Sequence, residues 1–135
     1  TARIVVIDDD AGVCDLLARV LTLAGHTVQC ARTGETGLAW VKAGELDCLI
    51  VDKNLPDMHG GEVVAEARRR IPGLPIVMVT AYPEPFSLGA ERPDVCLEKP
   101  FESLKAIEEA VLEALDVAKA PAASPLSGLF RNRRR

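Results

Sequence analysis

The chain has 135 residues, of which 48% are hydrophobic and 27% charged, and its net charge is −4. This length suits one domain, because two would each bury too small a core. No apolar run approaches the roughly 18 residues needed to span a membrane. The start shows no signal peptide, so we expect a cytoplasmic protein. The body is more acidic than the total suggests, since four of the 16 basic residues lie in the last five positions, and this argues against broad nucleic-acid binding.

Apolar runs alternate with helical patterns along the chain. The runs are rich in β-branched residues, as buried strands are, and the patterns between them repeat apolar residues at helical spacing. Strands are predicted over residues 4–7, 27–31, 48–51, 76–79 and 96–97, and helices over 11–24, 34–43, 61–70 and 103–119. Thr33 is expected to cap the second helix and Gly44 to end it. In the last helix the predicted inward face holds Leu104, Ile107, Val111, Leu112 and Leu115.

Two segments depart from this alternation. The stretch between the fourth and fifth strands contains Pro83, Pro85, Gly89 and Pro93, so at most one or two helical turns fit there, near residues 86–91. Residues 120–135 read as an Ala/Pro/Ser linker with a basic tail, which we predict to be disordered. A docking motif or an electrostatic anchor is the alternative for the tail. Residues 1–119 are then the folded domain, and the remainder is too short for a DNA-binding domain.

Alternating strands and helices predict an α/β fold with a parallel sheet covered by helices on both faces. Five such units in this length fit the flavodoxin-like, doubly wound arrangement with strand order 2-1-3-4-5, its fourth helix short or irregular. Ligands of this architecture bind at the carboxyl ends of the strands. The residues that directly follow each strand are therefore the candidates for a functional site.

Polar residues follow four of the five predicted strands: Asp8-Asp9-Asp10, Asp52, Thr80 and Lys99. Clustered carboxylates repel one another unless a cation joins them, and hard oxygen ligands suit Mg²⁺. Asp52 can then be both a metal ligand and a nucleophile that forms an acyl phosphate, with Thr80 and Lys99 contacting phosphate oxygens. Taken singly, each group has a plainer explanation, such as acids at a helix start or a polar loop residue. Their joint position at the carboxyl ends favours a site.

These segments resemble the response-regulator receiver domain of two-component signalling over roughly residues 3–118. The resemblance is carried by residues 4–10, 52–60, 79–81 and 99–101. It implies that Asp52 accepts the phosphoryl group and that Asp9 binds Mg²⁺ directly, Asp8 mainly through water and Asn54 through its backbone carbonyl. It further implies a switch role for Thr80, a phosphate contact for Lys99 and a cis Lys99–Pro100 bond.

The resemblance also implies the partners. A sensor histidine kinase or phosphotransfer protein would supply the phosphoryl group from a phosphohistidine, and a downstream protein would read the phosphorylated state. The chain would be a monomer or a weak homodimer. It would not be an enzyme beyond assisting its own phosphorylation and dephosphorylation.

Cys96 departs from the family pattern, because a Tyr or Phe usually stands three residues before the lysine. Together with the short stretch before the fifth strand, it leaves open a receiver-like interaction module that works without phosphorylation or with a non-standard switch. An aspartyl phosphatase or phosphotransferase is a third reading, but it needs a second acid where Asn54 stands.

Several other residues have plain explanations. The four cysteines, which lack CxxC spacing, are expected to be buried apolar thiols in a reducing compartment: Cys14, Cys30, Cys48 and Cys96. His26 and His59 are read as surface groups in turns and Trp40 as a packing residue. Lys53 is either a solvated lysine or a residue that guards the site entrance or contacts a partner.

Overall fold

The computed structural model describes residues 1–81 and 92–119. Its sheet has five parallel strands in the order β2-β1-β3-β4-β5, which confirms the predicted topology. The strands are β1 (Arg3–Ile7), β2 (Thr27–Ala31), β3 (Cys48–Asp52), β4 (Ile76–Thr80) and β5 (Val95–Glu98). The helices are α1 (Ala11–Leu23), α2 (Gly34–Ala43), α3 (Gly60–Arg70) and α4 (Leu104–Lys119). The predicted short helix near residues 86–91 and the tail over 120–135 lie outside the described residues.

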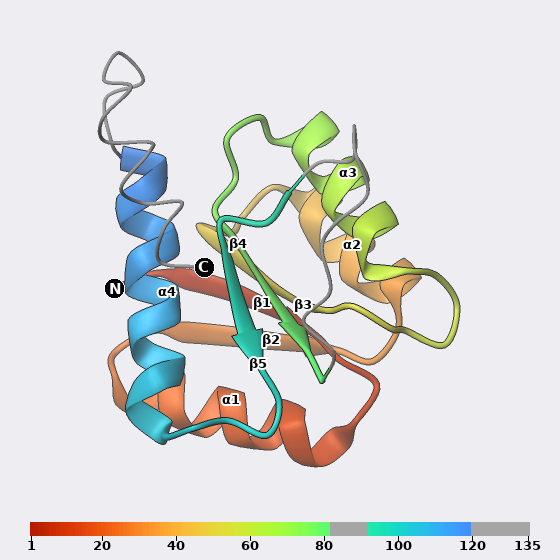
Figure 1. Ribbon diagram of the computed structural model, residues 1–135. Coiled ribbons are helices and arrows are strands. Elements are labelled where there is room, and N and C mark those ends of the chain that lie inside the picture. The colour runs from red at the N-terminus through yellow and green to blue at the C-terminus, as the bar shows by residue number, and fades with distance from the viewer. Residues whose placement is uncertain (82–91, 120–135) are drawn as a thin grey trace.

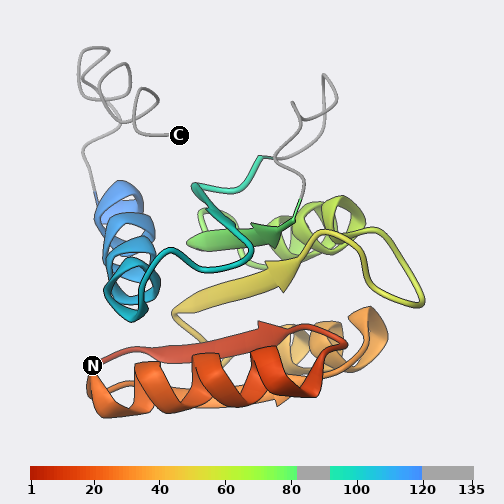
Figure 2. The ribbon, with the colours of Figure 1, turned by 60° about the horizontal axis from the view of Figure 1, so that its bottom comes forward.

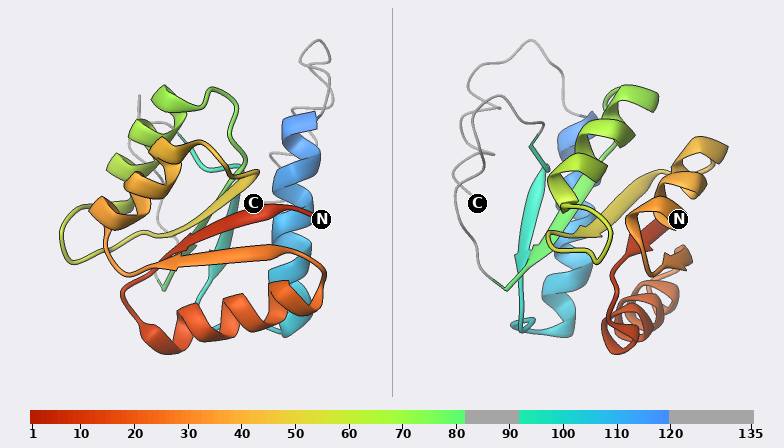
Figure 3. Two further views of the ribbon diagram at one scale, coloured as in Figure 1. Left: turned by 180° about the vertical axis from the view of Figure 1, so that it is seen from behind. Right: turned by 90° about the vertical axis from the view of Figure 1, so that its right-hand side faces the viewer.

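The helices cover the sheet in two pairs, α1 with α4 on one face and α2 with α3 on the other (Figures 1 and 3). Alternate residues of β1 show why: Ile4 and Val6 belong to the core under α1 and α4, whereas Val5 and Ile7 belong to the core under α2 and α3. Every residue of β3 and β4 is buried, as expected for central strands covered on both faces. In Figure 2, β1, β3 and β4 point the same way, so their carboxyl ends share one edge of the sheet.

The helix termini follow local signals in the sequence. Asp10 caps α1 by accepting hydrogen bonds from the amides of Gly12 (2.8 Å) and Val13 (3.3 Å). Thr33 caps α2 as predicted, and Gly44 ends it with a φ of 77°, a conformation that favours glycine. Because these caps set where each helix starts or ends, they also set the lengths of the loops that join the helices to the strands.

Some predicted burial is wrong. Cys30 is exposed and Cys96 is partly exposed, whereas Cys14 and Cys48 are buried. The reason is that β2 and β5 are the edge strands, which the helices cover incompletely. Trp40 is 41% exposed at the edge of α2 that borders β2, so it packs less than predicted.

The predicted inward face of the last helix was too wide. Leu104 (57% exposed) and Leu112 (59% exposed) lie at its margin, while Ile107 and Val111 are buried. Among residues 1–81 and 92–119, no helix combines the length and apolar character needed to cross a membrane.

Candidate functional site

Four strand ends bring the predicted site residues to one edge of the sheet. Asp52 and Thr80 are the last residues of β3 and β4, and Asp8 and Lys99 directly follow β1 and β5. The strand register sets them side by side, because Ile7 pairs with Val51, Asp52 with Val79 and Thr80 with Glu98. The convergence expected from the sequence is therefore present in the structure.

Lys99 reaches from β5 across the end of the sheet to the acids of β1 and β3. Its Nζ lies 2.9 Å from Asp8 Oδ2 and 3.7 Å from Asp52 Oδ2. Asp8 is 1% exposed, and its other oxygen accepts a hydrogen bond from the Asp10 amide at 2.9 Å. Thr80 is buried. The Lys99–Pro100 bond is cis, as the family resemblance implied. The ion pair between Lys99 and the buried Asp8 holds both side chains in place.

Asp8, Asp9 and Asp52 form a cluster in which one carboxylate oxygen of each lies within 4.8 Å of the others. Burial raises the pKa of Asp52, the charge of Asp8 raises it further, and Lys99 opposes the shift. Burial alone would lower the pKa of Lys99, but its hydrogen bond to Asp8 and the charge of Asp52 raise it overall. The nearby carboxylates therefore contribute to both shifts, after burial in the case of Asp52.

This donor set suits a hard divalent cation. Three carboxylates face one another while the ammonium of Lys99 offsets one of their charges, so a further positive charge would relieve the repulsion. Oxygen ligands with room for water are what Mg²⁺ prefers. The residues fit the ion that the family resemblance implied, with Asp8, Asp9 and Asp52 as its side-chain ligands.

Asn54 lies in the loop between β3 and α3, and its amide donates to Asp52 Oδ1 at 3.4 Å. The loop folds back on itself through a bridge between Asn54 and His59. The amide of Gly60 then donates to the Lys53 carbonyl at 2.6 Å. Asn54 is thus held beside the phosphoacceptor candidate, where its carbonyl could join the carboxylates. Lys53 is half-buried next to Asp52.

Two residues of this loop have roles that the sequence reading missed. Asp57 accepts hydrogen bonds from two backbone amides at the start of α2. His59, interpreted as a plain surface group, caps α3: its Nδ1 accepts from the Gly61 amide at 2.9 Å while Glu62 accepts from the His59 amide at 3.0 Å. The spacing of His59 and Glu62 is that of a capping box, a signal available in the sequence. The Asp57 contact joins residues far apart in the chain, so no local pattern indicates it.

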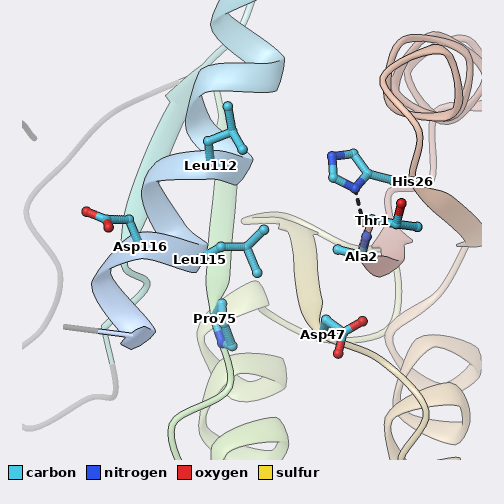
Figure 4. Close-up of a pocket in the computed structure, with 8 residues that line it drawn as sticks. All are labelled: Thr1, Ala2, His26, Asp47, Pro75, Leu112, Leu115 and Asp116. Atoms are coloured by element: carbon cyan, nitrogen blue, oxygen red, sulfur yellow. Dashed lines mark hydrogen bonds between the residues drawn. The ribbon is translucent and has the colours of Figure 1, made fainter. Parts of the chain in front are cut away.

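A hollow of about 540 Å³ lies at the opposite end of the sheet, where the strands begin (Figure 4). The bonds there serve the fold: the Ala2 amide donates to His26 Nδ1 at 3.0 Å and the Arg3 amide donates to Asp47 Oδ2 at 2.8 Å. Backbone and side-chain contacts with Arg3 lower the pKa of Asp47. The lining residues are Thr1, Ala2, His26, Asp47, Pro75, Leu112, Leu115 and Asp116. The clustered carboxylates and Lys99 therefore lie at the carboxyl ends of the strands and not in this hollow.

A family model described as "Response regulator receiver domain" matches residues 4–111. The chain belongs to this family. The match spans the predicted site residues of all four strand ends, and the observed sheet order is the one predicted from the alternating strands and helices. The site described above therefore lies within a receiver domain.

Solved structures and curated relatives agree with this membership. The receiver resembles a CheY-like receiver domain protein from Methanospirillum hungatei JF-1, with a TM-score of 0.76, 30% identity and coverage of 87% of this chain and 95% of that one. Chemotaxis response regulator CheY4 of Vibrio cholerae gives a TM-score of 0.76 at 26% identity, covering 85% and 99%.

Among curated proteins, the transcriptional regulatory protein GlrR of Escherichia coli is 32% identical over 118 residues, which are 85% of this chain and 26% of GlrR. TcrA of Mycobacterium tuberculosis is 40% identical over 79 residues, 58% of this chain and 31% of TcrA. The chain thus spans less than a third of the length of these regulators.

Proposed function

We propose that this receiver takes a phosphoryl group onto Asp52 from a phosphohistidine of a sensor histidine kinase or phosphotransfer protein. In this step an Asp52 carboxylate oxygen forms a bond to phosphorus while the bond between phosphorus and the histidine nitrogen breaks. The observation that carries the proposal is the cluster of Asp8, Asp9 and Asp52 with Lys99 at 2.9 Å from one acid and 3.7 Å from another. Such a site works by positioning and charge neutralisation.

Each residue has a distinct part in the proposal. Asp52 is the nucleophile, and its carboxylate, those of Asp8 and Asp9, and the Asn54 carbonyl would hold Mg²⁺. The ion would neutralise charge on the phosphoryl oxygens. Lys99 already lies within reach of Asp52, so it can turn to a phosphoryl oxygen as a compact positive charge. Thr80, at the end of the neighbouring strand, is proposed to donate its hydroxyl to another oxygen.

Signalling is proposed to occur through protein contacts in the cytoplasm. GlrR and TcrA are named as transcriptional regulatory proteins. For this receiver, a downstream protein is proposed to read the phosphorylated state. Cys96, half-buried in β5, stands where the family usually has an aromatic residue. This substitution is the reason to retain the second candidate, a receiver-like module that acts without phosphorylation.

Phosphodonor labelling separates the two candidates. The chain is incubated with acetyl phosphate and Mg²⁺, and its intact mass is measured. The parent should gain one phosphoryl group, Asp52→Asn should gain none, and Asp47→Asn should gain one, because Asp47 lies at the other end of the sheet. A parent chain that stays unmodified under conditions that label a known receiver would overturn the proposal and favour the second candidate.

A further inference from the structure

The loop between β3 and α3 is fastened to the start of α2 by one carboxylate. Asp57 Oδ1 accepts a hydrogen bond from the Gly34 amide at 2.8 Å, and Oδ2 accepts one from the Glu35 amide at 2.9 Å. These are two of the amides that a helix leaves without internal partners. Thr33, the cap residue of α2, accepts from the Thr36 amide at 3.1 Å. The first turn of α2 is therefore capped jointly by its own Thr33 and by a residue from another loop.

The neighbouring residue reinforces this link. A methyl group placed on Gly34 would lie 2.5 Å from Met58 Cγ, so the Met58 side chain rests directly on the first turn of α2. Glycine at this position permits the close approach. Asp57 and Met58 thus contact the same helical turn, one through charge-assisted hydrogen bonds and the other through packing.

The fastened loop is the one that carries Asn54. The Leu55 amide donates to the Met58 carbonyl at 3.3 Å, and Asn54 bridges His59, so Asp57 sits at the tip of a closed turn with Asn54 at its base. On the other side, Arg32, directly before the Thr33 cap, donates from Nε to the Asp9 carbonyl at 3.0 Å. Arg32, Gly34 and Glu35 together therefore contact both loops that supply the proposed metal ligands.

We propose that Asp57 is a positioning residue, which holds the loop 53–59 so that the Asn54 carbonyl stays beside Asp52. Arg32 and the amides of Gly34 and Glu35 are the common support against which this loop and the Asp9 loop are set. The inference rests on the proposed function, since it takes Asn54 as a metal ligand. A simpler role, in which Asp57 only stabilises α2, predicts the same loss of stability without an effect on the site.

The decisive comparison is between Asp57→Ala and Thr33→Ala. Both variants remove acceptors from the first turn of α2, but Thr33 has no bond to the loop 53–59 among the contacts described for residues 1–81 and 92–119. Calorimetric titration with Mg²⁺ should show affinity reduced about tenfold or more in Asp57→Ala, as for other residues that orient metal ligands. Thr33→Ala should bind Mg²⁺ as the parent does.

A second readout needs no metal. Without Mg²⁺, hydrogen exchange at the amides of residues 53–60 should be faster in Asp57→Ala and unchanged in Thr33→Ala. Asp57→Asn keeps one oxygen acceptor and should fall between parent and Asp57→Ala, which preserves the test if the alanine variant folds poorly. Equal Mg²⁺ affinity and equal exchange in Asp57→Ala and Thr33→Ala would overturn the inference. A parent chain that binds no Mg²⁺ and accepts no phosphoryl group would instead overturn the proposed function.

Discussion

Gly60 is the position where a single added methyl group should do most harm to the site. It is the first residue of α3 and is buried against the end of β3. A Cβ at Gly60 would lie 2.5 Å from the Asp52 carbonyl oxygen and 2.8 Å from Lys53 Cα. Both neighbours are backbone atoms, so no side-chain rotation can relieve the overlap. The backbone that carries the phosphoacceptor candidate must move instead.

The cost can be estimated. Overpacking costs up to about 3 kcal/mol, and alanine in place of glycine in a helix returns up to about 1 kcal/mol, so Gly60→Ala should lose about 2 kcal/mol. At about 4 °C per kcal/mol for a domain of this size, the melting temperature falls by about 8 °C. Acetyl phosphate labelling of Asp52 should slow as well, because its backbone is displaced.

Gly61→Ala is the matched control for Gly60→Ala. A Cβ at Gly61 would lie 3.1 Å from His59 Nδ1, which is a side-chain atom, so a small shift of the His59 ring relieves the contact at the cost of, at most, its hydrogen bond to the Gly61 amide. This variant should lose no more than about 1 kcal/mol, the usual contribution of a helix cap, and should keep normal labelling. Urea unfolding followed by circular dichroism measures both. If Gly60→Ala is as stable as Gly61→Ala and is labelled as fast, the close packing of α3 against β3 does not constrain Asp52.

Three further predictions concern single residues. Asp9→Ala should lower Mg²⁺ affinity by at least about tenfold, and unchanged calorimetric binding would refute its assignment as a ligand. Lys99→Ala should retain Mg²⁺ binding but weaken the structural response to phosphorylation, so equal amide chemical-shift changes in variant and parent would count against its proposed role. The third concerns Asp57, whose pKa is lowered because the amides of Gly34 and Glu35 donate to its carboxylate. Its contribution to stability should therefore be present at neutral pH and vanish as pH falls below about 4, and a stability difference between parent and Asp57→Ala that persists through this range would contradict it.

The sequence predicted the sheet well because burial and topology constrain it strongly. The β3 run Cys48–Asp52 is buried at every position, and a parallel strand covered on both faces must be almost continuously apolar. Helix ends were predicted where a local device sets them, as at Thr33 and Gly44. Burial was predicted wrongly where it depends on which strand lies at the edge of the sheet. Cys30 and Trp40 look like core residues in the chain, yet incomplete cover near β2 leaves both exposed.

The candidate site was predicted for a related reason. Parallel strands place their carboxyl ends together, so Asp8, Asp52, Thr80 and Lys99 could be grouped once the strand order was expected. What the sequence did not indicate is how the loops between them are held. The contact from Asp57 to the amide of Gly34 spans 23 positions of the chain, and nothing in the residue types near Asp57 specifies its partner.

The arrangement of charges explains why that loop support matters. Asp8 and Asp52 are nearly buried and face Asp9, and Lys99 lies closer to Asp8 than to Asp52. The ammonium therefore leaves Asp52 the less neutralised of the two buried acids, with a pKa that burial and Asp8 raise. Repulsion of this kind pushes loops apart unless they are tied to rigid elements. The central strands hold Asp8 and Asp52 directly, while Asn54 and Asp9 sit on loops that depend on the bonds from Asp57 and Arg32 to the backbone. The bonds from Asp57 and Arg32 therefore hold the two loops in place beside the clustered carboxylates.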